Sequence, residues 1–167
     1  VDLDAVRAAA RALLVAGAEA CAITFINAHA NGTNEAAAAR AVRAIWPNPD
    51  VSGSCEILAE IREFERSSTT ALNAYLQPGV AGYLSRLEGA LAEDGFNGHF
   101  HIVQSNGGIM STATARRMPV RTALSGPAAG VIAAAAIAHA AGFENAVTCD
   151  LGSTSFDVSL VAGGRME

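Results

Sequence analysis

The strongest constraint on the fold comes from the pattern of side chains near the C-terminal end of the chain. Apolar residues alternate with polar ones over 147–151 and again over 156–160. A period of two predicts two strands, each with one apolar and one polar face. The short stretch of small residues between them predicts a hairpin turn. The residues expected to share the polar face are Thr148, Asp150, Asp157 and Ser159.

The turn of this hairpin has the composition of a phosphate site. It reads Asp-Leu-Gly-Ser-Thr-Ser-Phe-Asp from Asp150 to Asp157, so two carboxylates flank small residues. We expect the backbone N–H groups of Gly152, Ser153 and Thr154 to face phosphate oxygens, and Asp150 to hold Mg²⁺ through water. The alternative interpretation of the octapeptide alone is a plain hairpin with an acidic rim.

Composition limits the classes of protein to which the chain can belong. Its 167 residues suffice for one domain or one lobe of a larger protein, and 51% are hydrophobic while only 16% are charged. Such a thin polar coat predicts apolar surface that needs a partner. The net charge of -5, with 11 dispersed basic residues, argues against nucleic-acid and membrane-surface binding. No apolar run approaches the roughly 20 residues that span a bilayer, so we expect a cytoplasmic protein.

The cysteines and histidines do not predict a metal site. Cys21, Cys55 and Cys149 are far apart and lack metal-ligand spacing, so they are expected to be small buried hydrophobes. His99 and His101 alternate on one predicted strand without a third ligand nearby. We therefore expect a solvated strand entry there.

Strand-like and helix-like segments alternate along the whole chain. This alternation predicts an α/β fold with a mainly parallel sheet and helices on both faces. Gly17 and Gly142 are placed to end helices, and Pro78 is expected to bend or divide the longest one. Helices are expected near 2–14, 35–45, 61–91, 113–118 and 127–141, and strands near 20–26, 51–58, 100–103, 147–151 and 156–160.

The last predicted helix carries a stripe of small residues. Gly126, Gly130, Ala134 and Ala138 lie four apart, which lets another backbone approach closely. High alanine content for helix propensity alone is the alternative explanation. A helix of this kind running into a strand, an Asp-x-Gly turn and a strand resembles the hinge-crossing helix and second phosphate loop of the actin-like ATPase superfamily, whose lobes are ribonuclease H-like.

Several motifs in order resemble one family within that superfamily. They are Glu60 to Thr70, Asn73 to Pro78, Gln104 to Gly108, Ser125 to Val131 and Asp150 to Asp157. Across essentially its whole length the chain looks like a member of the hydantoinase A and 5-oxoprolinase family, which also contains an acetone carboxylase component. It departs from the family pattern at Ser153, where the second glycine of the Asp-x-Gly-Gly-Thr turn is usual.

The resemblance implies an ATP- and Mg²⁺-dependent enzyme that phosphorylates an oxygen of a cyclic amide or ketone before ring opening or carboxylation. Asp150 would support the metal, and Asp157 would orient water or act behind it. The implied domains are the end of a first actin-like lobe over 1–124, a hinge-crossing helix over 125–142 and the start of a second lobe over 143–167. A hydantoinase B-type subunit or domain is the implied partner.

The chain begins with Val1 rather than Met and ends just after one hairpin. We therefore expect an internal fragment that is catalytically incomplete and that self-associates through its uncovered hairpin. A second function stays open: a non-catalytic actin-like nucleotide switch or assembly module. Ser153 keeps it open, because its Cβ occupies a place where the backbone or a phosphate favours glycine.

Two further segments are candidates for a cleft. The polar stretch that includes Arg62 and Arg66 is dense enough to line a substrate cleft or a subunit contact, although a solvated helix face would explain it equally. Asn106, Gly107 and Gly108 follow a predicted strand, where a ligand-facing loop is common. An Asn-Gly turn needs no ligand to explain it, however.

Overall fold

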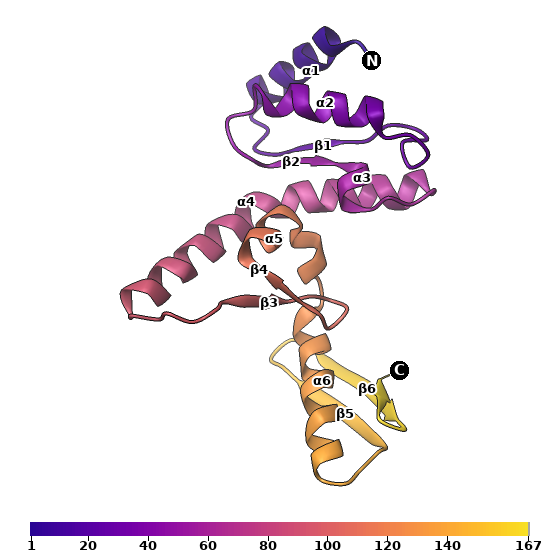
Figure 1. The fold of residues 1–167 in the computed structure, drawn as a ribbon, viewed down its shortest axis with the longest axis vertical. Coiled ribbons are helices and arrows are strands. Elements are labelled where there is room, and N and C mark those ends of the chain that lie inside the picture. Colours follow the sequence, from indigo (N-terminus) through magenta and orange to yellow (C-terminus); the bar gives the residue numbers. More distant parts are fainter. Residues whose placement is uncertain (167) are drawn as a thin grey trace. The chain divides into compact units, whose positions relative to one another are not determined.

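The computed structural model describes residues 1–166, which form two compact units (Figure 1). Unit 1 contains Val1–His99 and Thr112–Val120, and unit 2 contains Phe100–Ser111 and Arg121–Glu167, of which Glu167 is outside the described residues. The α/β character of the chain is confirmed in both.

Unit 1 is built on a parallel pair of short strands. β1 (Cys21–Ile23) pairs with β2 (Val51–Gly53) in the register Cys21↔Val51. Figure 1 shows α1 (Leu3–Val15) and α2 (Thr33–Arg43) over one face of the pair and α4 (Glu63–Glu93) along the other. The prediction of helices on both faces is therefore confirmed for this unit.

The core of unit 1 lies between α1, α2 and the strands. Asp2 starts α1 by accepting hydrogen bonds from the N–H groups of Asp4 and Ala5, both at 3.0 Å. Alanines on the inner sides of both helices have almost no exposed surface, so the helices approach closely. The core residues are Ala10, Cys21, Ile23, Ala38, Ala39, Val42, Trp46 and Val51.

The longest helix is continuous. α4 passes Pro78 without dividing, and the helix changes direction in its middle (Figure 1). The chain before it differs from the prediction, because the strand expected to run to residue 58 ends at Gly53 and α3 (Ser54–Ile57) follows. Ser54 and Cys55 both hydrogen-bond to the Glu35 carboxylate, which turns the backbone away from the strand direction. α5 (Thr112–Arg117) and the 3-10 helix η1 (Pro119–Thr122) follow later in the chain.

Unit 2 contains two antiparallel sheets and one long helix. β3 (His101–Val103) pairs with β4 (Ile109–Ser111), and β6 (Phe156–Ala162) pairs with β5 (Ala146–Leu151) and β7 (Arg165–Met166). The prediction of a mainly parallel sheet is thus not confirmed. The loops at 104–108 and 152–155 are too short for a crossover, so the strands that they join can only be antiparallel. The predicted C-terminal hairpin is confirmed.

α6 (Ser125–Ala140) ends as expected but begins differently. Gly142 has a φ of +86° directly after the C-cap Ala141, which is the predicted glycine stop. Ser125 and Gly126, the two residues that the sequence offers as N-caps before Pro127, both lie inside the helix. The N-cap is Leu124, in the left-handed region with a φ of 58°, and its side chain makes no capping bond.

None of the helices within residues 1–166 combines the length and the apolarity that a bilayer crossing requires.

Candidate functional site

The two carboxylates of the hairpin face each other across β5 and β6. Asp150 pairs with Asp157, and Thr148 pairs with Ser159 two residues further along. Residues opposite one another in an antiparallel pair share a face, with Cβ atoms about 5 Å apart. The predicted polar face is therefore confirmed. Two like charges so close favour a cation between or beside them.

The turn offers fewer donors than the sequence suggested. The Gly152 N–H donates to the Ser155 carbonyl at 2.9 Å, so this donor is already used within the turn. The N–H groups of Ser153 and Thr154, at the tip, have no acceptor among residues 1–166. Ser153 has no left-handed backbone, so this position does not require a glycine for its φ. Ser155 donates its hydroxyl to Asp157 Oδ2 at 3.3 Å.

The polar face of the hairpin is turned toward α6. A Cβ added at Gly130 would lie 3.3 Å from Asp150 Oδ2, closer than most such contacts. The stripe of small residues on α6 therefore leaves room for this carboxylate. Asp150 has no hydrogen-bond or ion-pair partner in the part of the chain that the structure describes, which leaves its oxygens available to a metal or its waters.

The opposite face of the hairpin is apolar and exposed. Val147 is 64% exposed, Leu151 79% and Phe156 59%. Cys149 is on this face and is exposed, so its predicted burial is wrong, whereas that of Cys21 is confirmed. No described element packs on this face of the sheet, which is why an apolar pattern did not mean burial.

The loop at Asn106, Gly107 and Gly108 is explained by the fold itself. Asn106 Oδ1 accepts from the Gly108 N–H at 3.0 Å, and Gly107 has a φ of +81°. The positive φ favours glycine here, and a Cβ at Gly107 would lie 2.5 Å from Ile132 Cδ1 on α6, the far end of a side chain that can move aside. Ile132 and Gly130 are about 200° apart around a helix. The loop and Asp150 therefore contact different sides of α6 and do not converge.

Arg66 is a buried residue of unit 1 whose guanidinium is fully used by the protein. It donates to Ser54 Oγ at 3.0 Å and to the carbonyls of Glu60 and Phe25, both at 2.7 Å. Its side chain has 0% exposure. Arg62, by contrast, is 73% exposed and pairs with Glu65 at 3.2 Å. Of the two arginines, Arg62 is therefore the one that remains accessible to a ligand.

Glu35 is a buried carboxylate that sequence reasoning missed. It accepts hydrogen bonds from Phe25 N at 2.9 Å, Ser54 Oγ at 2.6 Å and Cys55 N at 2.8 Å. Burial alone would raise its pKa, but these hydrogen bonds outweigh burial and lower the pKa below its ordinary value. Glu35 thereby ties the segment after β1, at Phe25, to the residues that follow β2. A lone acid in an alanine-rich helix gives no signal of this in the sequence.

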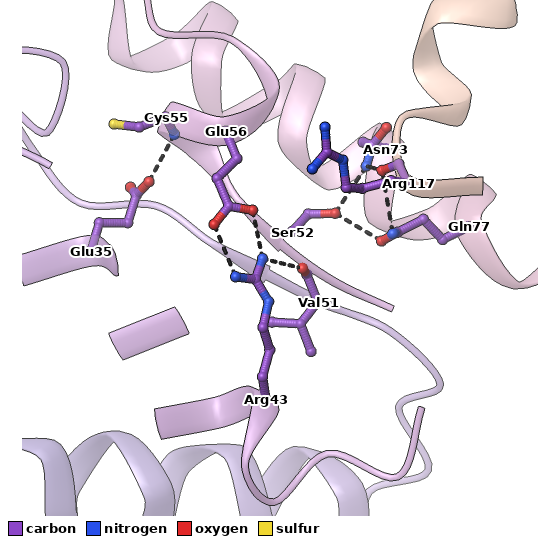
Figure 2. A network of polar contacts seen from close by, with 9 residues as sticks. All are labelled: Glu35, Arg43, Val51, Ser52, Cys55, Glu56, Asn73, Gln77 and Arg117. Atoms are coloured by element: carbon purple, nitrogen blue, oxygen red, sulfur yellow. Dashed lines mark hydrogen bonds and ion pairs between the residues drawn. The ribbon is translucent and has the colours of Figure 1, made fainter. Parts of the chain in front are cut away.

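The polar stretch of α4 continues as a buried stripe. Arg66, Thr70, Asn73 and Gln77 are at most 2% exposed and follow helical spacing. Figure 2 shows Asn73 and Gln77 bonded to Ser52, at 2.9 and 2.8 Å, and to the Arg117 carbonyl. The solvated-face interpretation is therefore wrong for Arg66, Thr70 and Asn73. Asn73 and Gln77 bond α4 to β2 and to the end of α5.

Metal ligands are sparse. Within residues 1–166 no group of three or more His, Cys, Asp or Glu side chains is arranged to hold a metal ion. His99 and His101 are exposed. The pair of Asp150 and Asp157 supplies two carboxylates, so a cation there would take its other ligands from water or from a phosphate.

The family model for hydantoinase/oxoprolinase matches residues 66–167, which is more than half of the chain. The chain belongs to the hydantoinase/oxoprolinase family. It spans only 13% to 24% of the length of the relatives below.

The caprolactamase alpha subunit of Pseudomonas jessenii is 37% identical over 147 residues, covering 88% of this chain and 21% of the relative. The acetone carboxylase beta subunit of Xanthobacter autotrophicus is 32% identical, covering 98% and 23%. The 5-oxoprolinase of Saccharomyces cerevisiae is 30% identical, covering 99% and 13%. Among solved structures, the nucleotide-free structure of acetone carboxylase, from work on ATP-dependent acetone carboxylation, superposes with a TM-score of 0.83 at 30% identity. The superposition covers 99% of this chain and 24% of the acetone carboxylase chain.

Proposed function

We propose that this chain supplies the phosphate-binding hairpin of an ATP-dependent enzyme of the hydantoinase/oxoprolinase type. The cross-strand pair of Asp150 and Asp157 is the observation that carries the proposal. Beside it, the tip presents the N–H groups of Ser153 and Thr154 without acceptors among the described residues. Paired carboxylates next to free backbone donors suit a metal–phosphate complex, because they neutralise both of its charges.

Each residue has a distinct role in this proposal. Asp150 would hold magnesium through water, and Asp157 would orient a water or support the waters around the metal. The donor set fits, because Mg²⁺ is usually bound by one or two carboxylates together with waters and phosphate oxygens. Bound magnesium would neutralise charge on the transferred phosphoryl group. Ser153 and Thr154 grip the phosphate oxygens, while Gly152 shapes the turn.

We also propose that the chain contributes to both lobes of an actin-like, ribonuclease H-like fold. Residues 1–124 form the end of the first lobe, 125–142 the hinge-crossing helix and 143–167 the start of the second lobe. The similarity in fold to acetone carboxylase supports this assignment. Arg62 in unit 1 and the loop at 106–108 in unit 2 each remain a candidate for contact with substrate.

The substrate proposed is a cyclic amide or a ketone whose oxygen accepts the phosphoryl group. The names of the caprolactamase, 5-oxoprolinase and acetone carboxylase relatives support this class. The partner proposed is a hydantoinase B-type subunit or domain, since two of these relatives are named as subunits. The cytoplasm is the proposed location.

The test is ATP hydrolysis by the intact protein with and without hydantoin or 5-oxoproline. Stimulation by either substrate is expected, and Asp150→Asn should reduce it by about a hundredfold or more. Glu144→Gln, an exposed acid just before β5, is the matched control and should leave it unchanged. Full activity in Asp150→Asn would contradict the role assigned to Asp150.

A non-catalytic nucleotide switch would bind ATP but ignore these small substrates. Ser153 is the residue that favours such a switch, and its ordinary backbone conformation removes one of the two arguments for it.

A further inference from the structure

Unit 1 contains a cavity of about 370 Å³ with an unusual set of charges. It lies between the end of α2, the start of β2, the middle of α4 and α5. Its size is within the range of sites for small molecules. The charged residues that line it are Arg43, Asp50, Glu56, Arg116 and Arg117.

Two of the three arginines are already neutralised. Arg43 forms a two-pronged pair with Glu56, with distances of 2.9 and 2.5 Å, and also donates to the Val51 carbonyl at 2.9 Å (Figure 2). The Glu56 carboxylate raises the pKa of Arg43, so the pair stays charged and closed. Arg116 pairs with Glu88 and donates to Ser85 Oγ at 3.3 Å. The positive charge of each of these guanidinium groups is therefore already balanced by a carboxylate of the protein.

Asp50 is the unpaired anion of the cavity. It is 8% exposed, and its carboxylate has no hydrogen-bond or ion-pair partner among the residues that the structure describes. Burial raises its pKa, as expected for a carboxylate without a compensating charge. A buried carboxylate in this state is costly to the fold and gains from any ligand that donates to it.

Arg117 is the unpaired cation. Its backbone carbonyl accepts from Asn73 and Gln77, at 3.0 and 3.4 Å, which fixes the position of the residue. Its guanidinium has no hydrogen-bond or ion-pair partner in residues 1–166, and so it forms no ion pair with Asp50. After the two closed pairs are set aside, the cavity therefore presents one free negative and one free positive charge.

We propose that this cavity binds a small zwitterion of the amino-acid type, with its ammonium group on Asp50 and its carboxylate on Arg117. An ammonium group donates several hydrogen bonds to a carboxylate, and a guanidinium binds a carboxylate in a two-pronged geometry. An amine without a carboxylate leaves Arg117 unused. A carboxylate without an amine adds a second negative charge beside Asp50, and a polyphosphate finds only one free cation among the described residues that line the cavity.

Calorimetric titration of the intact protein tests the ligand class. The probes are glycine, β-alanine, 4-aminobutanoate and 5-aminopentanoate, which separate the two charges by increasing lengths. Butylamine and pentanoate carry one charge each. We expect one zwitterion to bind at least about tenfold more tightly than either singly charged molecule. Equal affinities, or no saturable binding by any zwitterion up to about 10 mM, would overturn the proposal.

Charge-removing variants test the location. Asp50→Asn and Arg117→Gln should each weaken the best zwitterion by about tenfold or more. Asp94→Asn and Arg40→Gln remove exposed charges of the same unit that do not line the cavity, and they should leave binding unchanged. Unchanged binding in a folded Asp50→Asn or Arg117→Gln variant would contradict the site. The comparison of probes on the wild-type protein stands even if a variant fails to fold.

Discussion

Replacing Glu35 by glutamine tests how unit 1 holds the two chain segments that leave β1 and β2. The wild-type carboxylate is 2% exposed and accepts hydrogen bonds from one hydroxyl and two backbone N–H groups. Glutamine has nearly the same shape, but one of its two oxygens becomes an NH₂ group that must face a donor. The change therefore removes charge and one acceptor without opening a cavity.

The magnitude follows from these bonds. If the amide oxygen takes the place of Oε2, the bonds from Phe25 and Ser54 survive in weaker, neutral form and the bond from Cys55 is lost. A hydrogen bond to a charged group contributes about 1.5–3 kcal/mol and a neutral one about 0.5–1.5 kcal/mol. Easier burial of a neutral side chain offsets part of the loss. We expect Glu35→Gln to lower the free energy of unfolding of unit 1 by about 2–4 kcal/mol.

The effect has a defined dependence on pH. The pKa of Glu35 in the folded protein lies below its ordinary value of 4.5, because the hydrogen bonds outweigh burial. A depressed folded pKa contributes stability above the unfolded pKa, and this contribution is lost as the pH falls through the folded value. The difference in unfolding free energy between wild type and Glu35→Gln should therefore have its full size above pH 4.5 and should decrease as the pH falls below that value.

Fluorescence of Trp46 reports this unfolding selectively. It is the single tryptophan of the chain and is buried in the core of unit 1. Urea titrations at neutral and acidic pH, with the exposed Glu93→Gln as control, give the difference in unfolding free energy. A Glu35→Gln unfolding free energy within about 0.5 kcal/mol of the control at neutral pH would refute the hydrogen-bond reasoning.

Two other predictions concern unit 2. Gly130→Ala improves helix propensity by about 1 kcal/mol but places a methyl group 3.3 Å from Asp150 Oδ2. ATP hydrolysis by the intact protein should therefore fall, while its thermal stability should not. Unchanged hydrolysis would show that this carboxylate has room to move. The exposed apolar face of β5 and β6 should make the chain of residues 1–167 self-associate, and Val158→Lys, at a position 54% exposed, should reduce it. Light scattering measures this, and a clean wild-type monomer at high concentration would count against it.

The elements whose pattern is long or strongly marked could be predicted from the sequence. The helices α1, α2, α4 and α6 and the β5–β6 hairpin are all expected, because apolar spacing, caps and glycine stops are local signals. β4 is missed because three residues after a turn carry too little pattern. The prediction of a mainly parallel sheet was too broad. Whether two strands pair in parallel depends on which strands are neighbours and on how long their connection is, and short strands do not reveal this in the sequence.

The candidate sites were less predictable for a different reason. Polar residues at helical spacing are typical of a solvated face, yet Arg66, Thr70, Asn73 and Gln77 are buried, and three of them bond to partners far away in the sequence. Likewise, the isolation of Asp50 depends on Arg43 and Arg116 being paired elsewhere. Such facts arise from tertiary pairing, which no local pattern records.

The polar contacts of α4 have a consequence for motion. A helix seated on a sheet through apolar side chains can shift slightly at little cost, because such contacts are non-directional. Sliding α4 by one turn, about 5.4 Å, would instead separate Arg66, Asn73 and Gln77 from their hydrogen-bond partners at the same time. Each buried group left without a partner would cost about 1–3 kcal/mol of stability. This helix therefore has a single alignment on its strands, and we expect unit 1 to move as a rigid body in any conformational change of the protein.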